Sequence, residues 1–274
     1  SARVARVASR GRHSAMGWFS LGGNLGFAAA PVLVTAVVAA GGLALTPLLV
    51  VPALAGSVLC LPVLRALDRR GPSTSGPKPG SDDVAAFLRL SAAVVFRSVV
   101  FAGLSTFIAL YARQRTGGGV AAGSLALLLL YLGGAVGTVL GSRLADRWDR
   151  VTVLRWSYLA TVVAVAGVVF VPGPAVYVFV ALTSACLYVP FSLQVTLAQD
   201  YLPTRVGTAG GVTLGLTVSI GGLASPLIGT IADHTTLRTA LAPLVVVPAL
   251  AWLAVRRLRE PALPTFDEPV QHAA

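Results

Sequence analysis

The sequence has few charged residues. Only 11% of its 274 residues are Asp, Glu, Lys or Arg, whereas a soluble globular domain usually carries about 25%. Hydrophobic residues make up 55% of the chain, and the mean hydropathy is +0.81. A chain of this composition has too little polar surface to stay dispersed in water. The composition therefore excludes a disordered protein, a cytosolic enzyme and a disulfide-stapled secreted domain, and it indicates a multi-span membrane protein.

The few cysteines and histidines form no catalytic or metal-binding pattern. Cys60 and Cys186 are more than 100 residues apart and lie in apolar stretches, which is typical of buried spectators. His13, His234 and His272 lie at predicted interfaces or in tails. The sequence contains no HExxH motif and no carboxylate pair inside a predicted span. We therefore predict no enzymatic activity, no metal and no cofactor.

Apolar runs long enough to cross a membrane occur eight times. A transmembrane helix needs about 20 apolar residues to cross a hydrocarbon core of about 30 Å. We place the predicted spans at residues 14–40, 44–64, 87–111, 120–141, 152–171, 174–198, 208–232 and 238–255. The predicted fold is an all-α membrane protein with eight transmembrane helices.

Basic residues gather on one side of the predicted membrane. Eight spans place both ends of the chain on that side, which holds 17 of the 21 basic residues, while the opposite side holds three. The positive-inside rule makes the basic side cytoplasmic. The net charge of +11 then reflects orientation in the cell membrane, and it predicts no nucleic-acid partner.

A Pro-, Gly- and Ser-rich segment divides the chain. Residues 67–86 are typical of a flexible cytoplasmic linker. Two spans precede it within residues 1–66, six follow within residues 87–256, and residues 257–274 form a cytoplasmic tail. Six helices are a natural half of a transporter built from two six-helix repeats.

An internal repeat extends this interpretation. Aligning Pro31 with Pro226 places Gly26 on Gly221, and both helices carry small residues every four positions, including Gly22. Such a stripe lets two membrane helices approach closely. The alignment makes the first span the fifth helix of one half and the seventh span the fifth helix of the other. We therefore expect the chain to correspond to helices 5–12 of a twelve-helix protein, without its first four helices.

The segment Gly141-Ser-Arg-Leu-Ala-Asp-Arg-Trp-Asp-Arg150 resembles the loop signature G-x-L-A-D-R-x-G-R-R of the major facilitator superfamily. The residues Asp146, Arg147 and Arg150 match, whereas Val151 stands where the family has a final basic residue. The resemblance implies a gating loop. In such a loop Asp146 would pair with arginines or face the N-terminus of a helix, and these contacts would break when the two halves of the transporter rock.

The segment Gly22–Pro31 also resembles the Gly/Pro signature that marks antiporters in this family, with Ala30 in place of a glycine. The runs Phe19–Gly26 and Pro190–Gly210 look like the fosmidomycin-resistance branch. That likeness implies drug export driven by proton antiport. Yet none of the ten acidic residues falls in the middle of a predicted span, so the coupling carboxylate is not identified.

Polar residues inside spans are the candidates for substrate or coupling contacts. Arg97 lies about ten residues into a span, where a charge is costly and usually faces a bundle interior. It could bind an anionic phosphonate by paired charge-assisted bonds, or it could be a structural arginine that is capped by carbonyls or snorkels to the cytoplasmic edge. Asn24 and Gln194 are further candidates, with interhelical hydrogen bonding as the alternative. Asp200 and Arg205, before the seventh span, are interpreted as an interfacial pair or gate.

The predicted function is secondary active transport, as proton-coupled efflux of a small drug-like or anionic compound by alternating access. The predicted partners are a small-molecule substrate, protons and the lipid bilayer, and the full-length protein is expected to be a monomer. Two alternatives remain at this point: a truncated membrane protein that does not transport, and a transporter of another small solute.

Overall fold

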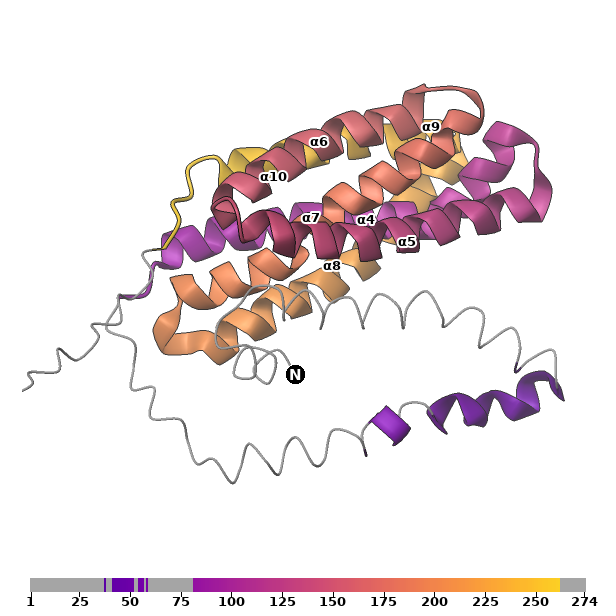
Figure 1. The fold of residues 1–274 in the computed structure, drawn as a ribbon. Coiled ribbons are helices and arrows are strands. Elements are labelled where there is room, and N and C mark those ends of the chain that lie inside the picture. Colours follow the sequence, from indigo (N-terminus) through magenta and orange to yellow (C-terminus); the bar gives the residue numbers. More distant parts are fainter. Residues whose placement is uncertain (1–36, 38–40, 52–53, 57, 59–80, 262–274) are drawn as a thin grey trace, which may run out of the picture.

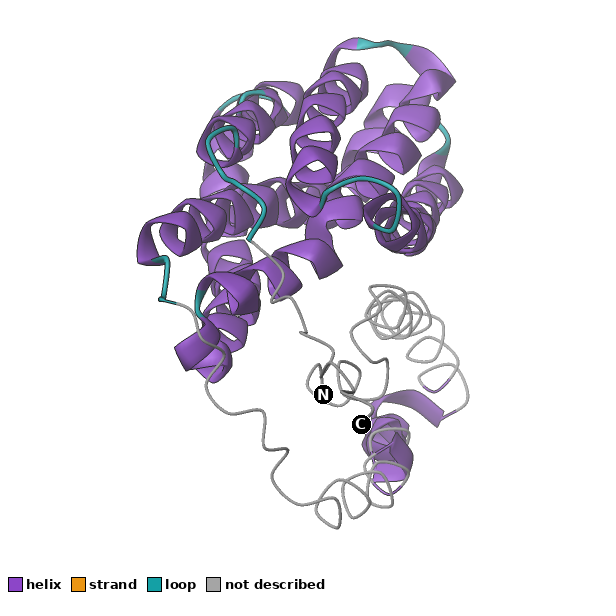
Figure 2. Cartoon of the chain, turned by 60° about the vertical axis from the view of Figure 1, so that its left-hand side comes forward, coloured by secondary structure: helices purple, strands orange, loops and turns teal. Residues whose placement is uncertain are grey.

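The structure is a computed structural model that describes residues 37, 41–51, 54–56, 58 and 81–261. All regular secondary structure within these residues is helical, which confirms the predicted all-α membrane fold (Figure 2). A short 3-10 helix, η1 (Gly42–Leu49), covers the start of the second predicted span. The first predicted span lies outside the described residues except for residue 37, and so do Asn24, Gly22, Gly26 and Pro31, while the second predicted span is described in part.

Six segments among the described residues are long and apolar enough to cross a membrane, and they coincide with the last six predicted spans (Figure 1). Their mean hydropathy lies between 1.6 and 2.0. Three are single helices: α4 (Val84–Thr116), α5 (Gly119–Ala145) and α6 (Arg150–Phe170). The others are η2 (Gly173–Ala175) with α7 (Val176–Tyr201), η3 (Pro203–Arg205) with α8 (Val206–His234), and α9 (Leu237–Leu241) with η4 (Ala242–Val245) and α10 (Val247–Val255).

Local capping residues set where the helices begin and end. The carboxylate of Asp83 accepts a hydrogen bond from the backbone N–H of Ala86 at 2.9 Å and so caps α4. Gly117 ends the same helix with a left-handed φ of 67°, a conformation that glycine adopts without steric cost. The carboxylate of Asp149 caps α6 by accepting from the N–H of Thr152 at 2.8 Å.

Helices α5 and α7 approach each other closely along a glycine stripe. A Cβ atom added to Gly133 would lie 2.6 Å from the carbonyl oxygen of Ala181. Added Cβ atoms at Gly137 and Gly141 would overlap the α7 backbone in the same way. Small residues at membrane helix interfaces allow this backbone contact, so the glycines of α5 determine how near α7 can lie.

We expect Gly137→Val to separate α5 from α7 and to lower the thermal stability of the purified protein. Its side chain would meet the backbone of Ala185, which cannot move aside as a flexible side chain can. Gly215→Val is the matched control, because a Cβ there meets no described atom within 4 Å. Thermal unfolding in detergent measures both. Equal melting temperatures for the two variants would contradict the predicted role of the stripe.

Helix α4 packs against four other spans of the described bundle, α5, α7, α8 and α10. Its side chains contribute to two hydrophobic clusters, one toward each end of the bundle. Helix α8 is the least buried of the six spans, with 11% of its most apolar window buried. Large aliphatic residues on the outer surface, such as Val163 at 68% and Val218 at 77% exposure, are typical of side chains that face lipid.

Candidate functional site

Arg97 lies near the middle of α4 and is 2% exposed. Its Nη2 donates a hydrogen bond to the hydroxyl of Thr217 on α8 at 3.3 Å. Its guanidinium carbon lies 5.0 Å from the ring centroid of Phe191 on α7, a cation–π distance. The side chain is therefore enclosed by three helices.

The charge of Arg97 has no carboxylate partner among the described residues. The acidic residues of the described chain all lie at helix ends or in connections, namely Asp82, Asp83, Asp146, Asp149, Asp200, Asp233 and Glu260. The Nε of Arg97 is buried and has no hydrogen-bond partner there. A buried cation with one long hydrogen bond and no counter-ion among the described residues is costly, and its Nε donor is unused there.

Gln194 lies on α7, one turn beyond Phe191, and is 1% exposed. Its Nε2 donates to the hydroxyl of Tyr158 on α6 at 2.5 Å. Gln194 therefore makes an interhelical hydrogen bond, which was one of the two roles considered for it. Its Oε1 is also buried and has no partner among the described residues, so an acceptor remains near the aromatic residue that Arg97 contacts.

Aromatic side chains line the neighbourhood of Arg97. The rings of Phe101 and Tyr188 meet edge to face at 5.3 Å, and Tyr188 and Phe191 lie 5.9 Å apart. The sequence analysis selected Arg97 and Gln194 as candidates. It did not predict that Phe191 and Thr217 contact Arg97. Phe191 is one of many apolar residues in the span. Thr217 lies four residues before Gly221 in the predicted small-residue stripe.

That stripe on α8 lies against α4. Thr217 accepts the bond from Arg97, and a Cβ added to Gly221 would lie 3.3 Å from the Cβ of Ala102. Ser225 shares a hydrogen bond with Thr106 at 3.0 Å. Pro226 lies within α8, which continues through it.

The predicted gating loop separates into exposed and buried residues. Asp146 ends α5 and is exposed, as is Arg147. Arg150 is 3% exposed, and its Nη1 lies 2.7 Å from the Oδ2 of Asp200 at the end of α7. Asp200 thus pairs with Arg150 of a different helix, whereas Arg205 lies 3.8 Å from the carboxylate of Asp82.

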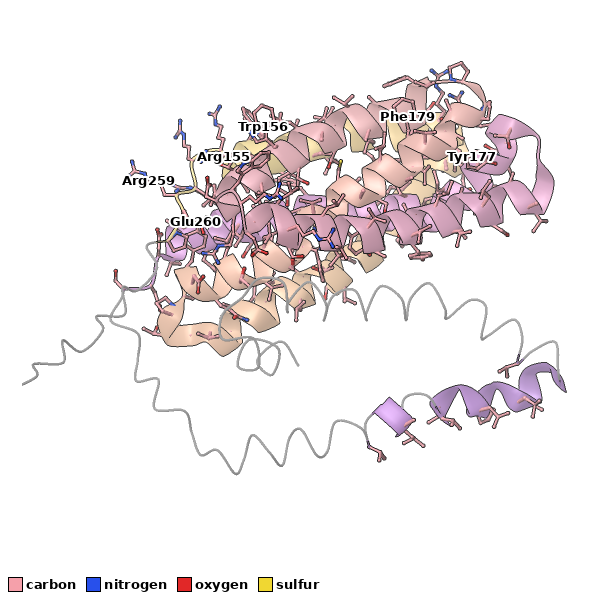
Figure 3. The ribbon with its side chains drawn as sticks, in the orientation of Figure 1. Arg155, Trp156, Tyr177, Phe179, Arg259 and Glu260 are labelled. Atoms are coloured by element: carbon pink, nitrogen blue, oxygen red, sulfur yellow. The ribbon has the colours of Figure 1, made fainter. Side chains whose placement is uncertain are left out.

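Glu260, in the segment after α10, completes this ion-pair cluster, and Figure 3 shows it near Arg155 and Arg259 at the same end of the bundle. The Oε1 of Glu260 lies 2.5 Å from the Nε of Arg150, and its Oε2 accepts the backbone N–H of Val151 at 3.2 Å. Arg155 donates to the carbonyl of Leu258 at 2.6 Å. We call Arg150, Asp200 and Glu260 the inner cluster. It joins the start of α6, the end of α7 and the chain beyond α10.

A second contact joins α4 to the connection between α7 and α8. Thr204 donates its hydroxyl to Asp82 at 2.5 Å, and this bond holds the pKa of the Asp82 carboxyl below its ordinary value. Arg205 lies 3.8 Å from the same carboxylate. Because this pKa is lowered, the contact stabilises the folded protein at pH values above the ordinary carboxyl pKa. The stabilisation is lost as the pH falls through the lowered pKa of Asp82.

The described arginines concentrate at the end of the bundle that holds the inner cluster. We call it the arginine-rich end, and it includes Arg89, Arg143, Arg147, Arg150, Arg155, Arg205, Arg256, Arg257 and Arg259. Arg155, Arg259 and Glu260 lie together at this end in Figure 3, whereas Tyr177 and Phe179 lie at the other. The described residues contain no group of His, Cys, Asp and Glu that could hold a metal ion.

A bundle of six apolar helices with a buried cation among three of them is typical of helical membrane transporters. The sequence model of the Major Facilitator Superfamily matches residues 1–226. Because this match covers most of the chain, the protein belongs to the major facilitator superfamily, and it is a multi-pass membrane protein.

Two curated relatives are similar to the chain. The fosmidomycin resistance protein of Escherichia coli (strain K12) is 27% identical over 264 residues, which cover 93% of this chain and 65% of that protein. The uncharacterized MFS-type transporter YfnC of Bacillus subtilis (strain 168) is 30% identical over 128 residues, covering 47% and 31%. The chain thus spans less than two thirds of the length of either relative.

Solved structures support the same fold. The superfamily transporter FucP in the outward conformation matches with a TM-score of 0.58 and 17% identity, covering 62% of this chain and 42% of that one. A single-residue variant of FucP, the fucose:proton symporter of Escherichia coli, matches with a TM-score of 0.52 and 18% identity, covering 63% and 41%.

Proposed function

We propose that the protein is a secondary active transporter that exports a small anionic compound by alternating access, in exchange for protons. The observation that carries this proposal is the buried guanidinium of Arg97, which has an unpaired Nε and no described carboxylate nearby. The similarity to a fosmidomycin resistance protein supports the same substrate class, because fosmidomycin is an anionic phosphonate.

The geometry around Arg97 suits an acidic group attached to an apolar body. A phosphonate or carboxylate accepts charge-assisted hydrogen bonds from a guanidinium, which are stronger than neutral ones. The rings of Phe191 and Tyr188 offer apolar surface beside the cation. The free Oε1 of Gln194 would accept a hydroxyl or amide donor. In this proposal an anion replaces the counter-ion that Arg97 lacks among the described residues.

The proposed orientation places the arginine-rich end in the cytoplasm of a cell whose plasma membrane holds the protein. The excess of arginines at that end supports it through the positive-inside rule. Residues 1–66 then contribute two helices to one half-bundle, residues 67–86 form the linker, residues 87–256 form the other half-bundle and residues 257–274 form a cytoplasmic tail. We expect cysteines placed at exposed Arg147 and Arg113 to be labelled from opposite sides by an impermeant reagent. Labelling of both from outside the cell would refute this orientation.

The function is tested in cells that express the complete gene. We expect a raised resistance to fosmidomycin and a lower intracellular content of the drug than in cells with an empty vector. Collapse of the proton gradient should abolish the difference. Resistance without lower drug content would argue against export, and an unchanged response to every anionic compound tested would overturn the proposed substrate class.

A further inference from the structure

Helix α7 contains a proline directly before the residue that contacts Arg97. Pro190 lies within α7, and Phe191 follows it, with its ring centroid 5.0 Å from the guanidinium carbon of Arg97. A proline has no backbone N–H, so it cannot donate the hydrogen bond that a helical residue makes to the carbonyl four positions earlier. The carbonyl of Cys186 therefore lacks the donor that a regular helix would supply.

A side chain of α6 supplies the missing donor. The hydroxyl of Ser157, a buried residue, donates to the carbonyl oxygen of Cys186 at 2.5 Å. Serine and threonine hydroxyls inside helices often bond to a carbonyl of their own helix instead, as Thr161 does one turn later on α6. The bond of Ser157 leaves its own helix and ends at the carbonyl that Pro190 deprives of a donor.

Two consecutive residues of α6 hold α7 on both sides of this proline. Ser157 binds the turn before Pro190. The hydroxyl of Tyr158 accepts a hydrogen bond from the Nε2 of Gln194, in the turn after Pro190, at 2.5 Å. Phe191 lies between these two points of attachment along α7. The place of its ring beside the guanidinium therefore depends on how α6 holds α7 at the proline.

The proline also separates two segments of α7 that different helices hold. Before it, Cβ atoms added to the glycines of α5 would overlap the carbonyl oxygens of Ala185 and Val189, so this segment packs backbone to backbone against α5. After Pro190, hydrogen bonds of Gln194 and Asp200 attach α7 to α6. The bond of Ser157 lies where one segment meets the other, and it ties the end of the first segment to α6.

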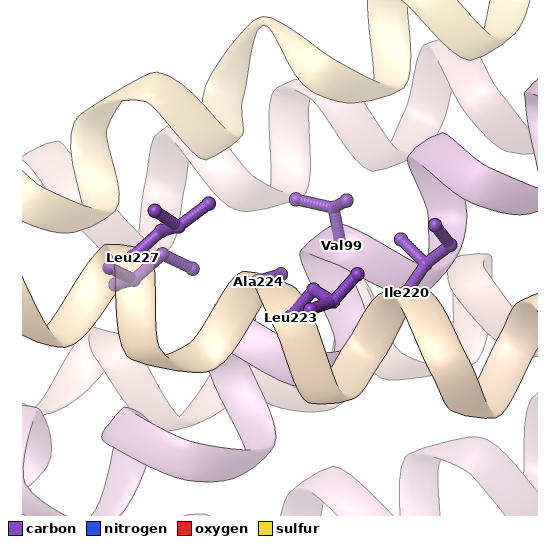
Figure 4. A pocket seen from close by; sticks show the side chains of 6 residues that line it. Val99, Ile220, Leu223, Ala224 and Leu227 are labelled. Carbon is purple, nitrogen blue, oxygen red and sulfur yellow. The ribbon is translucent and has the colours of Figure 1, made fainter.

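The proline inside α8 has no such partner among the described residues. Pro226 deprives the carbonyl of Gly222 of its helical donor in the same way, but the nearby hydroxyl of Ser225 donates to Gly221. Beside this part of α8 lies a groove of about 230 Å³, with Val99 of α4 on its other side, and its aliphatic lining offers no donor (Figure 4). A proline within a span is thus not always supplied with a donor from a neighbouring helix, which makes the contact at α7 specific.

We propose that Ser157 is a positioning residue of the Arg97 site, because its hydroxyl replaces the backbone donor that Pro190 lacks and so fixes Phe191 beside the guanidinium. The inference rests on the proposed function, since it concerns the site at which the anion is expected to bind. Without the hydroxyl, the carbonyl of Cys186 is left unpaired inside the membrane, which costs more than the bond alone is worth. The segment beyond Pro190 is then held only by its later bonds, and Phe191 loses its fixed place.

The test is a double-mutant cycle of Ser157→Ala and Pro190→Ala in the complete gene product. We expect Ser157→Ala to raise the KM for the exported anion about fivefold, the size expected for one buried hydrogen bond, and to lower the melting temperature. Pro190→Ala gives residue 190 a backbone N–H that can bond to Cys186. In that background Ser157→Ala should change neither the KM nor the melting temperature. If Ser157→Ala alone folds poorly, recovery of folded protein in the double variant provides the same comparison.

Ser98→Ala is the matched control, because it removes a buried hydroxyl that bonds to Val94 of its own helix at 2.8 Å. It should leave the KM unchanged. An unchanged KM in Ser157→Ala, or an equal loss with and without Pro190, would overturn the proposal. The melting temperatures do not depend on transport. A complete gene product that exports no anion would therefore refute the proposed function, while the cycle would still decide whether Ser157 serves the carbonyl that Pro190 leaves free.

Discussion

Export of the anionic substrate falls to the level of an empty vector when Arg97 is replaced by alanine in the complete gene product, while the amount of protein in the membrane stays unchanged. This is the largest effect that we expect. Arg97 is the buried cation of the candidate site, and its Nε has no described partner. Losing a charge-assisted hydrogen bond to an anion removes both affinity and the orientation of the substrate.

Stability distinguishes this role from a structural one. Among the described residues, Arg97 makes one hydrogen bond of 3.3 Å, to Thr217, and no ion pair. Removing an uncompensated buried charge does not cost stability in the way that removing one partner of a buried pair does. We therefore expect Arg97→Met to unfold at or above the wild-type temperature. A markedly lower melting temperature would show that the side chain is a structural arginine.

Conservative variants sharpen the same test. Arg97→Lys keeps the charge but loses the planar fork of donors, so we expect a raised KM with transport still measurable. Thr217→Val removes the only described hydrogen-bond partner of the guanidinium and should weaken transport less than Arg97→Ala. Normal export by the Arg97→Ala variant would refute the assignment of Arg97 to the substrate site.

The second large effect is expected at the inner cluster. Arg150→Met should destabilise the protein by about 2–3 kcal/mol, because it removes the buried cation that Asp200 and Glu260 share. The side chains of these two carboxylates are 13% and 31% exposed, which limits the effect through solvent screening. A loss of this size lowers the melting temperature by roughly 5–10 °C.

Arg147→Met is the matched control, since it removes an exposed arginine from the same loop three residues earlier. We expect its melting temperature to stay within about 1 °C of the wild type, as for other substitutions of exposed residues. Thermal unfolding of both variants in the same detergent measures the difference. Equal shifts would mean that the loop matters only through its net charge and that the inner cluster does not hold the helices together.

Most of the described helical framework could be predicted from sequence. The spans predicted at 87–111 and 120–141 correspond to α4 and α5, because long apolar runs have one stable structure in a bilayer. The predicted ends fell short by a few residues, since α4 continues to Thr116 with polar residues in its last turn. Hydropathy identifies the residues that lie in the hydrocarbon core. The capping residues Asp83 and Gly117 determine where α4 begins and ends.

The ion pairs could not be predicted. Arg150 and Asp200 are 50 residues apart, and Glu260 is 110 residues from Arg150. Nothing in the local pattern chooses between Arg205 and Arg150 as the partner of Asp200. The choice depends on which helix ends meet, because the start of α6, the end of α7 and the chain beyond α10 come together only in the folded bundle.

The sequence by itself determined that this protein is an all-α membrane protein, that six of its spans lie between residues 87 and 255, and that Arg97 lies inside one of them. These features follow from composition and periodicity, which act over about 20 residues at a time. Only the tertiary structure decided that Arg97 meets Thr217 and Phe191, that Arg150 joins Asp200 to Glu260, and that a groove remains where α8 meets α4. Each of these depends on side chains from different helices, and their distances are set by the packing of the whole bundle.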